Sequence, residues 1–63
     1  MFEAPWQARA HAMAVLFVEA TGSNWDAFRT CLVDAIGERP DRAYWESWVV
    51  ALDRFATQAG LLN

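Results

Sequence analysis

The segment that follows Pro5 constrains the fold of this 63-residue chain more than any other. Proline suits the first turn of a helix, where its missing N–H group would have no intrahelical partner. From Pro5 to Ala20 the chain contains no glycine, no second proline and few β-branched side chains. Because such a composition favours the helical conformation, the sequence predicts a helix over residues 5–20.

This predicted helix is apolar on nearly every side. Successive helical residues lie about 100° apart around the axis, which assigns each side chain to a face. One arc contains Trp6, Ala10, Met13, Ala14 and Phe17, whereas Val15, Leu16 and Val18 fall on the other sides. A domain of about 60 residues buries only about 60% of the surface of its unfolded chain. We therefore expect part of this helix to be covered by a partner outside the chain.

Large apolar side chains are too numerous for a core of this size. Hydrophobic residues make up 56% of the chain and include four Trp and four Phe. The surplus is expected to form an exposed apolar patch, and such patches usually mark an interface. Two alternatives stay open, namely a tightly packed aromatic core with a few exposed residues and a homodimer.

A second helix is predicted over residues 25–36. Gly22 can end the first helix in the left-handed conformation, and Ser23 or Asn24 can cap the second. Gly37 is expected to end it.

A third helix is predicted over residues 42–59. Pro40 forbids continuation of the second helix, Asp41 can cap the third, and Gly60 can close it. No strand pattern, repeat or linker is visible. The sequence therefore predicts an all-α fold, with three helices in a single domain that spans residues 1–63.

Charge and cysteine content disfavour several function classes. The net charge is −3, with five arginines and no lysine, which argues against nucleic-acid binding. Arginine without lysine fits forked hydrogen bonds to oxyanions, although a GC-rich genome produces the same bias. No secretory signal is recognisable and Cys31 cannot form an internal disulfide, so a cytoplasmic location is expected. The apolar run 12–18 is far short of the ~20 residues that span a bilayer.

The sequence offers few groups for chemistry. Cys31 and His11 lack the repeated spacing of a metal site; Cys31 is expected to be a buried thiol and His11 a surface or interface residue. Arg29 borders the apolar stripe of the second helix, where its guanidinium either extends to water or binds an oxyanion on a partner. Tyr44 and Trp48, four residues apart, either line a pocket or belong to the core. Nothing indicates an enzyme that is active alone.

The order and spacing of aromatic residues over nearly the whole chain resemble one known family. The residues are Phe2, Pro5-Trp6-Gln7-Ala8-Arg9-Ala10, Glu19-Ala20, Gly22, Trp25-Asp26-Ala27-Phe28-Arg29, Tyr44-Trp45, Trp48, Leu52 and Gly60-Leu61. This pattern is similar to the N-terminal helical domain of nitrile hydratase β subunits. The same domain occurs in nitrile hydratase accessory proteins and in the small chain of thiocyanate hydrolase.

The resemblance implies a helical domain that wraps a metal-bearing α subunit. In the family, the α subunit holds non-haem iron or non-corrin cobalt through a cysteine cluster, two members of which are oxidised to sulfinic and sulfenic acid. The metal acts as a Lewis acid in the hydration of a nitrile to an amide. Because this chain has one cysteine, it is not the metal-bearing subunit, and no metal or cofactor is expected in it.

The resemblance also implies roles for individual residues. Arg29 corresponds to the β-subunit arginine that hydrogen-bonds the oxidised cysteine oxygens. Tyr44 and Trp48 correspond to members of a Tyr-Tyr-x-x-Trp pattern that face the substrate pocket in related enzymes. Trp45 departs from the second tyrosine of that pattern and removes a hydroxyl group, and His11 replaces the usual phenylalanine with a more polar side chain.

Three roles for the chain remain open at this stage. A full β subunit continues into an SH3-like barrel, whereas this chain stops at Asn63. It is expected to be either a subunit that packs on the α chain, with the barrel as a separate β chain, or an accessory chain that assists metal loading. The third alternative is a self-associating helical domain without an enzyme. The residues predicted to contact a partner are Trp6, Met13, Phe17, Trp25 and Trp45.

Overall fold

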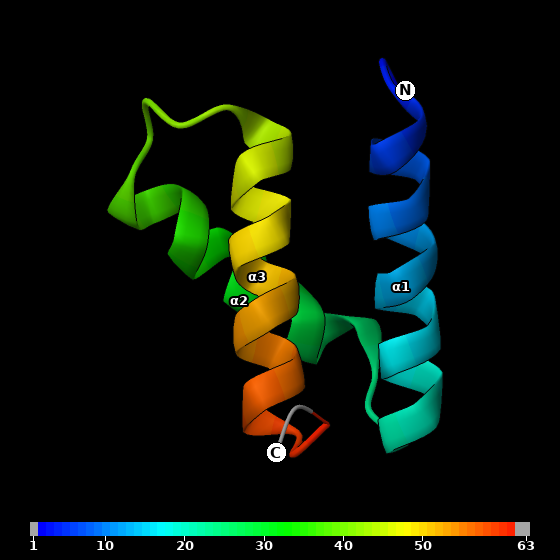
Figure 1. The fold of residues 1–63 in the computed structure, drawn as a ribbon. Coiled ribbons are helices and arrows are strands. Elements are labelled where there is room, and N and C mark those ends of the chain that lie inside the picture. The colour runs from blue at the N-terminus through cyan, green and yellow to red at the C-terminus, as the bar shows by residue number, and fades with distance from the viewer. Residues whose placement is uncertain (1, 62–63) are drawn as a thin grey trace.

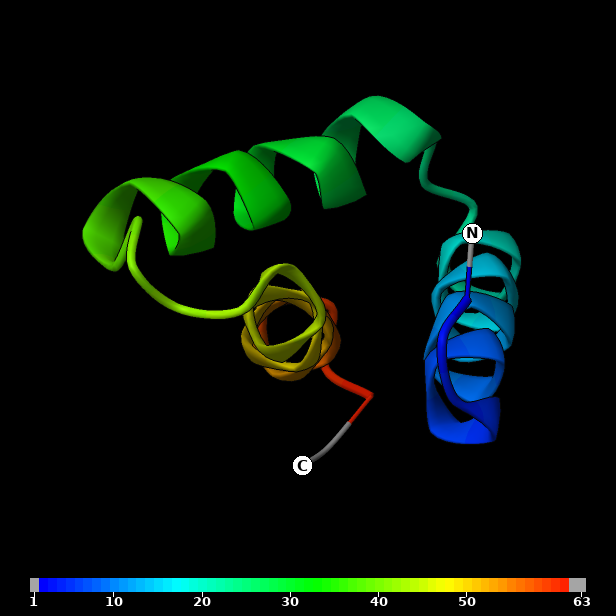
Figure 2. The ribbon, with the colours of Figure 1, turned by 90° about the horizontal axis from the view of Figure 1, so that it is seen from above.

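The computed structural model describes residues 2–61, which form three helices (Figure 1). They are α1 (Pro5–Thr21), α2 (Trp25–Glu38) and α3 (Tyr44–Gln58). The predicted all-α, three-helix fold is confirmed, and residues 2–61 contain no strand. α1 and α3 run side by side in the same direction, and α2 crosses on one side of this pair (Figure 2).

The loop between α1 and α2 uses the signals that the sequence contains. Gly22 ends α1 with a φ of 67°, a left-handed conformation that glycine adopts readily because it has no Cβ atom. Asn24 then caps α2, and its side-chain oxygen accepts a hydrogen bond from the N–H of Ala27 at 3.1 Å. Of the two predicted caps, Asn24 is the one that binds the helix.

α2 is longer than the sequence predicts. It passes through Gly37 and ends at Glu38. A glycine inside a helix weakens it by only about 1 kcal/mol, so Gly37 does not stop the chain. The next residue, Arg39, precedes Pro40 and is not helical, with a φ of −140° and a ψ of 74°, because proline disfavours the helical conformation in the residue before it.

The start of α3 corrects a prediction. The sequence places this start at residue 42 with Asp41 as the cap, whereas α3 begins at Tyr44. Asp41 instead pairs with Arg39, whose Nε lies 3.3 Å from Asp41 Oδ1. The N-cap position is Ala43, which has no side-chain cap. The carboxylate is therefore bound by a nearby guanidinium within the loop and not by the helix.

The core is built from one face of each helix. Phe28 of α2 is its most deeply buried large side chain, at 1% exposure, and its ring lies 4.9 Å from that of Trp48 and 5.9 Å from that of Phe55. From α1 the core receives Ala10, Ala14 and Val18. α1 therefore contacts the rest of the molecule mainly through small side chains, and most of its large ones are left outside.

The N-terminus of α1 is closed by a buried polar side chain. Gln7 is 6% exposed, and its side-chain oxygen accepts hydrogen bonds from the backbone N–H groups of Glu3 and Ala4. Gln7 thus stabilises the start of the helix, where Ala4 has no cap of its own to offer.

Within residues 2–61, no helix has both the length and the apolar character needed to cross a membrane.

Candidate partner-binding surfaces

A cluster of aromatic rings joins the three helices and positions the predicted site residues. Trp48 lies at its centre, with its ring 4.9 Å from Phe28 and 5.0 Å from Trp45. Trp48 is 7% exposed, and its indole N–H is buried without a hydrogen-bond partner among the described residues. An unpaired buried donor costs about 1–3 kcal/mol, so packing of the rings must hold Trp48 in place.

The cluster reaches the surface at His11. The His11 ring lies 5.7 Å from Trp48, 6.1 Å from Trp25 and 5.8 Å from Phe2. His11, Trp25 and Phe2 are all exposed. The predicted surface position of His11 is therefore confirmed, and the imidazole forms part of an exposed aromatic patch.

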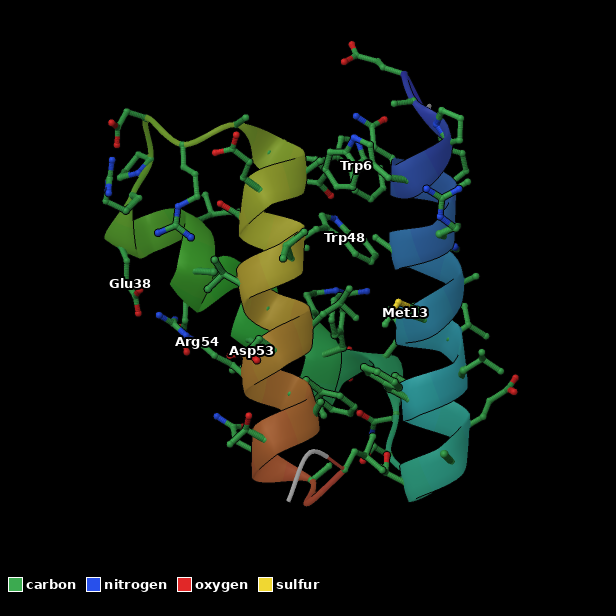
Figure 3. The ribbon with its side chains drawn as sticks, in the orientation of Figure 1. Trp6, Met13, Glu38, Trp48, Asp53 and Arg54 are labelled. Atoms are coloured by element: carbon green, nitrogen blue, oxygen red, sulfur yellow. The ribbon has the colours of Figure 1, made fainter. Side chains whose placement is uncertain are left out.

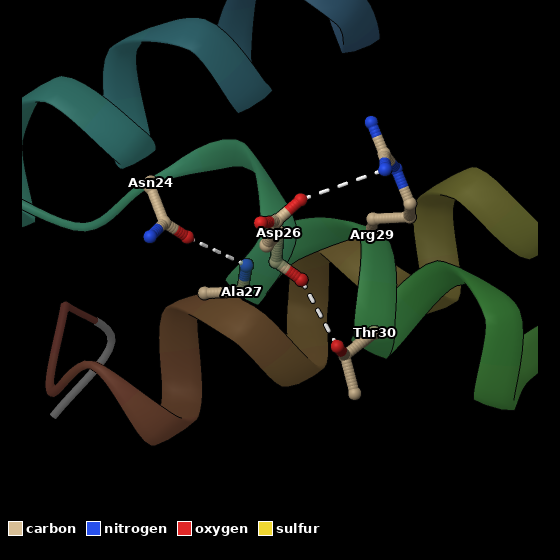
Figure 4. A network of polar contacts seen from close by, with 5 residues as sticks. All are labelled: Asn24, Asp26, Ala27, Arg29 and Thr30. Carbon is tan, nitrogen blue, oxygen red and sulfur yellow. Dashed lines mark hydrogen bonds and ion pairs between the residues drawn. The ribbon is translucent and has the colours of Figure 1, made fainter.

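Arg29 lies one helical turn after Trp25 on α2. Its side chain is 71% exposed, and its Nη1 lies 3.5 Å from Asp26 Oδ1, as Figure 4 shows. Within residues 2–61 this is the ion pair that Arg29 makes. Because both groups are exposed to water, the pair is weak, and the guanidinium remains available to an anionic group on another molecule.

Tyr44 and Trp48 occupy different environments. Tyr44 is 54% exposed at the start of α3, whereas Trp48 belongs to the core. Trp45 links them, with its ring 5.6 Å from Tyr44 and 5.0 Å from Trp48. Tyr44 is therefore accessible to another molecule, whereas the buried Trp48 packs against Trp45, which in turn packs against Tyr44.

An apolar groove separates α1 from α3. It has a volume of about 380 Å³ and is formed by the following residues: Trp6, Arg9, Ala10, Met13, Phe17, Val49, Leu52, Asp53 and Ala56. Figure 3 shows Trp6 and Met13 on the side of α1 that faces α3. Both are exposed, as is Val49 across the groove. Residues 2–61 thus leave this apolar groove open to the solvent.

Two opposite charges lie within this groove. Arg9 belongs to α1 and Asp53 to α3. Neither takes part in the ion pairs found among residues 2–61. An apolar groove with one unpaired charge of each sign offers both burial and orientation to a helix that lies in it.

The predicted interface residues differ in exposure. Trp6, Met13 and Trp25 are exposed, whereas Phe17 and Trp45 are half-buried against the core. Sequence reasoning missed Arg9 and Asp53 because a charge at the edge of an apolar face looks like an ordinary solvated residue. Only the placement of α1 beside α3 brings these two charges into the same groove.

On the side of α3 opposite the groove, an ion pair joins α3 to α2. Arg54 donates hydrogen bonds of 2.6 and 2.7 Å to the Glu38 carboxylate (Figure 3). This bonding lowers the pKa of Glu38 and raises that of Arg54.

Cys31 is buried as predicted, and burial raises the pKa of its thiol, with Asp34 acting in the same direction. Burial and this shift disfavour the thiolate, which is the reactive form of cysteine.

The described residues provide no metal centre. No group of three or more His, Cys, Asp or Glu side chains within residues 2–61 is arranged to hold an ion. What this part of the chain does provide is an exposed, weakly paired guanidinium, exposed aromatic rings and an apolar groove. These are the features of a surface that binds another protein.

The family model described as nitrile hydratase beta subunit, N-terminal, matches residues 1–63. The chain belongs to this family. No curated protein and no solved structure gave a match.

Proposed function

We propose that this chain is the helical part of a nitrile hydratase-like enzyme and packs on the metal-bearing α subunit. The match over residues 1–63 to the beta-subunit N-terminal family carries this proposal. The exposed apolar groove supports it, because Trp6, Met13 and Val49 would lose their contact with water when a partner covers them.

In this proposal the metal belongs to the partner. The α subunit would hold cobalt or iron, which supplies Lewis-acid chemistry toward the nitrile or its water. The described residues of this chain contain no ligand set of their own. Their contribution is to bind the α subunit and to orient groups at the edge of its active site.

Arg29 is the residue of this chain that we propose for direct contact with the α subunit's oxidised cysteines. A guanidinium can donate two parallel hydrogen bonds to sulfinate or sulfenate oxygens. The exposure of Arg29 and its weak pairing with Asp26 support this role. Tyr44, which is accessible, would face the substrate pocket, and the buried Trp48 would hold the ring of Trp45 against it.

The test is co-purification of this chain with a metal-bearing α subunit, and with a barrel-type β chain where that is separate. Val49→Glu places a charge in the groove, and Val33→Glu is its matched control because Val33 is exposed on α2 and does not line the groove. We expect a stable, metal-containing, nitrile-hydrating complex that Val49→Glu disrupts and Val33→Glu preserves.

Other outcomes would assign a different role. A chain that binds only the metal-free α subunit, and is absent from the active enzyme, is an accessory protein for metal loading. If no α subunit is bound and the chain forms dimers that Val49→Glu dissociates, it is a self-associating domain. Either result overturns the proposed structural role.

A further inference from the structure

A second pocket lies between the first turns of α1 and α3. Its volume is about 350 Å³, and it is lined by Trp6, Tyr44 and Trp45 together with the carboxylate residues Glu3 and Glu46. Gln7 and Ala43 complete the lining. Trp6 also lines the apolar groove, so its side chain stands between the groove and this pocket.

The three aromatic rings of the pocket have different orientations. The Trp6 ring is inclined at 80° to that of Trp45, with the centroids 6.4 Å apart. The Tyr44 ring is inclined at 79° to that of Trp45, with the centroids 5.6 Å apart. Trp6 and Tyr44 are 40% and 54% exposed, so a ligand can reach both rings. Rings that border one space at different angles suit a cation, which is attracted to an aromatic face.

The charge around the pocket is negative. Glu3 and Glu46 line it, no arginine or histidine does, and neither carboxylate is in an ion pair within residues 2–61. The first turn of α3 contributes a positive partial charge of about half a unit. Two carboxylates outweigh it. At the start of α1, Gln7 already binds the N–H groups of Glu3 and Ala4, so these donors are not free for an anion.

We propose that this pocket binds the guanidinium group of an arginine side chain from another protein chain. Guanidinium is planar, so it can stack on Trp6 or Tyr44 while its N–H groups donate to Glu3 or Glu46. An ammonium group is more strongly hydrated and cannot stack in this way. This binding does not require the α subunit, so the chain alone suffices to test it.

The test is to titrate small probe compounds into the full chain and to monitor the indole N–H signals of Trp6 and Trp45 by nuclear magnetic resonance. The probes are N-acetyl-arginine methylamide, the corresponding citrulline compound, which has a similar shape and no charge, and the lysine compound. We expect the arginine compound to shift both signals with saturation in the millimolar range, the lysine compound to bind more weakly, and citrulline to leave the signals unchanged.

Variants assign the binding to this pocket. Glu46→Gln is expected to raise the dissociation constant of the arginine compound by about two- to five-fold, the range of one exposed charge pair. Glu19→Gln is the matched control, because Glu19 is also exposed but does not line the pocket. The proposal is overturned if arginine produces no shift, if citrulline or lysine binds as tightly, or if both variants weaken binding equally. None of these outcomes bears on α-subunit binding, which the co-purification measures.

Discussion

Replacement of Arg29 by alanine separates a role at a partner's active site from a role in folding. The Arg29 side chain is 71% exposed and its Nη1 lies 3.5 Å from Asp26 Oδ1. An exposed pair of this kind within a helix contributes roughly 0.3–0.5 kcal/mol. Arg29→Ala is therefore expected to lower the free energy of unfolding by no more than about 0.5 kcal/mol, as measured by urea titration of the isolated chain.

The expected effect on the enzyme complex is much larger. A hydrogen bond to a charged group contributes about 1.5–3 kcal/mol, and each 1.4 kcal/mol corresponds to a factor of about ten. If Arg29 holds oxidised cysteine oxygens in the α subunit, its loss should slow nitrile hydration by roughly 10- to 150-fold. The assay compares the hydration rate of complexes with equal metal content, and the metal content itself is measured separately.

Arg39→Ala is the matched control for this experiment. Arg39 is also an exposed arginine that pairs with a nearby aspartate, Asp41, at 3.3 Å, but it lies in the α2–α3 loop. Equal hydration rates in the Arg29→Ala and Arg39→Ala complexes would refute the proposed contact. A loss of metal occupancy in Arg29→Ala, with normal turnover of the loaded enzyme, would instead indicate an accessory role in metal loading.

Two further predictions concern stability. Phe28→Ala should remove the cooperative thermal unfolding transition. Truncating a phenylalanine that is 1% exposed costs about 3–5 kcal/mol, while the free energy of unfolding of a domain of this size is about 3–9 kcal/mol in total. The control Val33→Ala, at a 59% exposed site, should change the transition little. Arg54 lowers the pKa of Glu38, so this pair stabilises the fold above the ordinary glutamate pKa of about 4.3 and the effect is lost as the pH falls through the lower folded value. In Glu38→Gln, the free energy of unfolding should therefore depend less on pH below about pH 4.3. The measurement is a series of urea titrations at different pH, and the same pH dependence in the variant and the unchanged chain would contradict this prediction.

Helix positions were predictable where one local signal acts alone. Gly22 ends α1 as expected, and Asn24, one of the two predicted caps, binds the start of α2. The start of α3 was not predictable in this way. Asp41 has two possible partners, the helix N-terminus and the guanidinium of Arg39, and only the folded loop shows that Arg39 binds it.

The buried face of α1 also required the structure. Because this helix is apolar on nearly all sides, periodicity alone could not rank one face above another. The predicted arc contains the buried Ala10 and Ala14 but also the exposed Trp6 and Met13. Small side chains are buried because they allow α1 to approach its neighbours, a property of packing between helices that no single-residue preference expresses.

The predicted site residues show the same limit. Arg29 and Tyr44 lie at the surface, but Trp48 is enclosed by other rings. Spacing of four residues places Tyr44 and Trp48 on one side of a helix. This spacing does not show that Trp45 lies between the rings of Tyr44 and Trp48, or that α1 and α2 cover Trp48 and leave Tyr44 exposed.

The distribution of side-chain size explains why this domain favours a partner. Its buried apolar residues include Ala10, Ala14, Ala35, Ala51 and Ala56, whereas Trp6, Met13, Leu16 and Val49 are between 40% and 61% exposed. Complete burial of one such large side chain contributes about 1.5–3 kcal/mol, so covering the remaining half of these four would contribute roughly 3–6 kcal/mol before the cost of association. This is comparable with the whole stability of a domain of this size, about 3–9 kcal/mol. A complex therefore gains most by covering the large side chains that the isolated chain leaves exposed, and partner binding should raise the melting temperature of the chain.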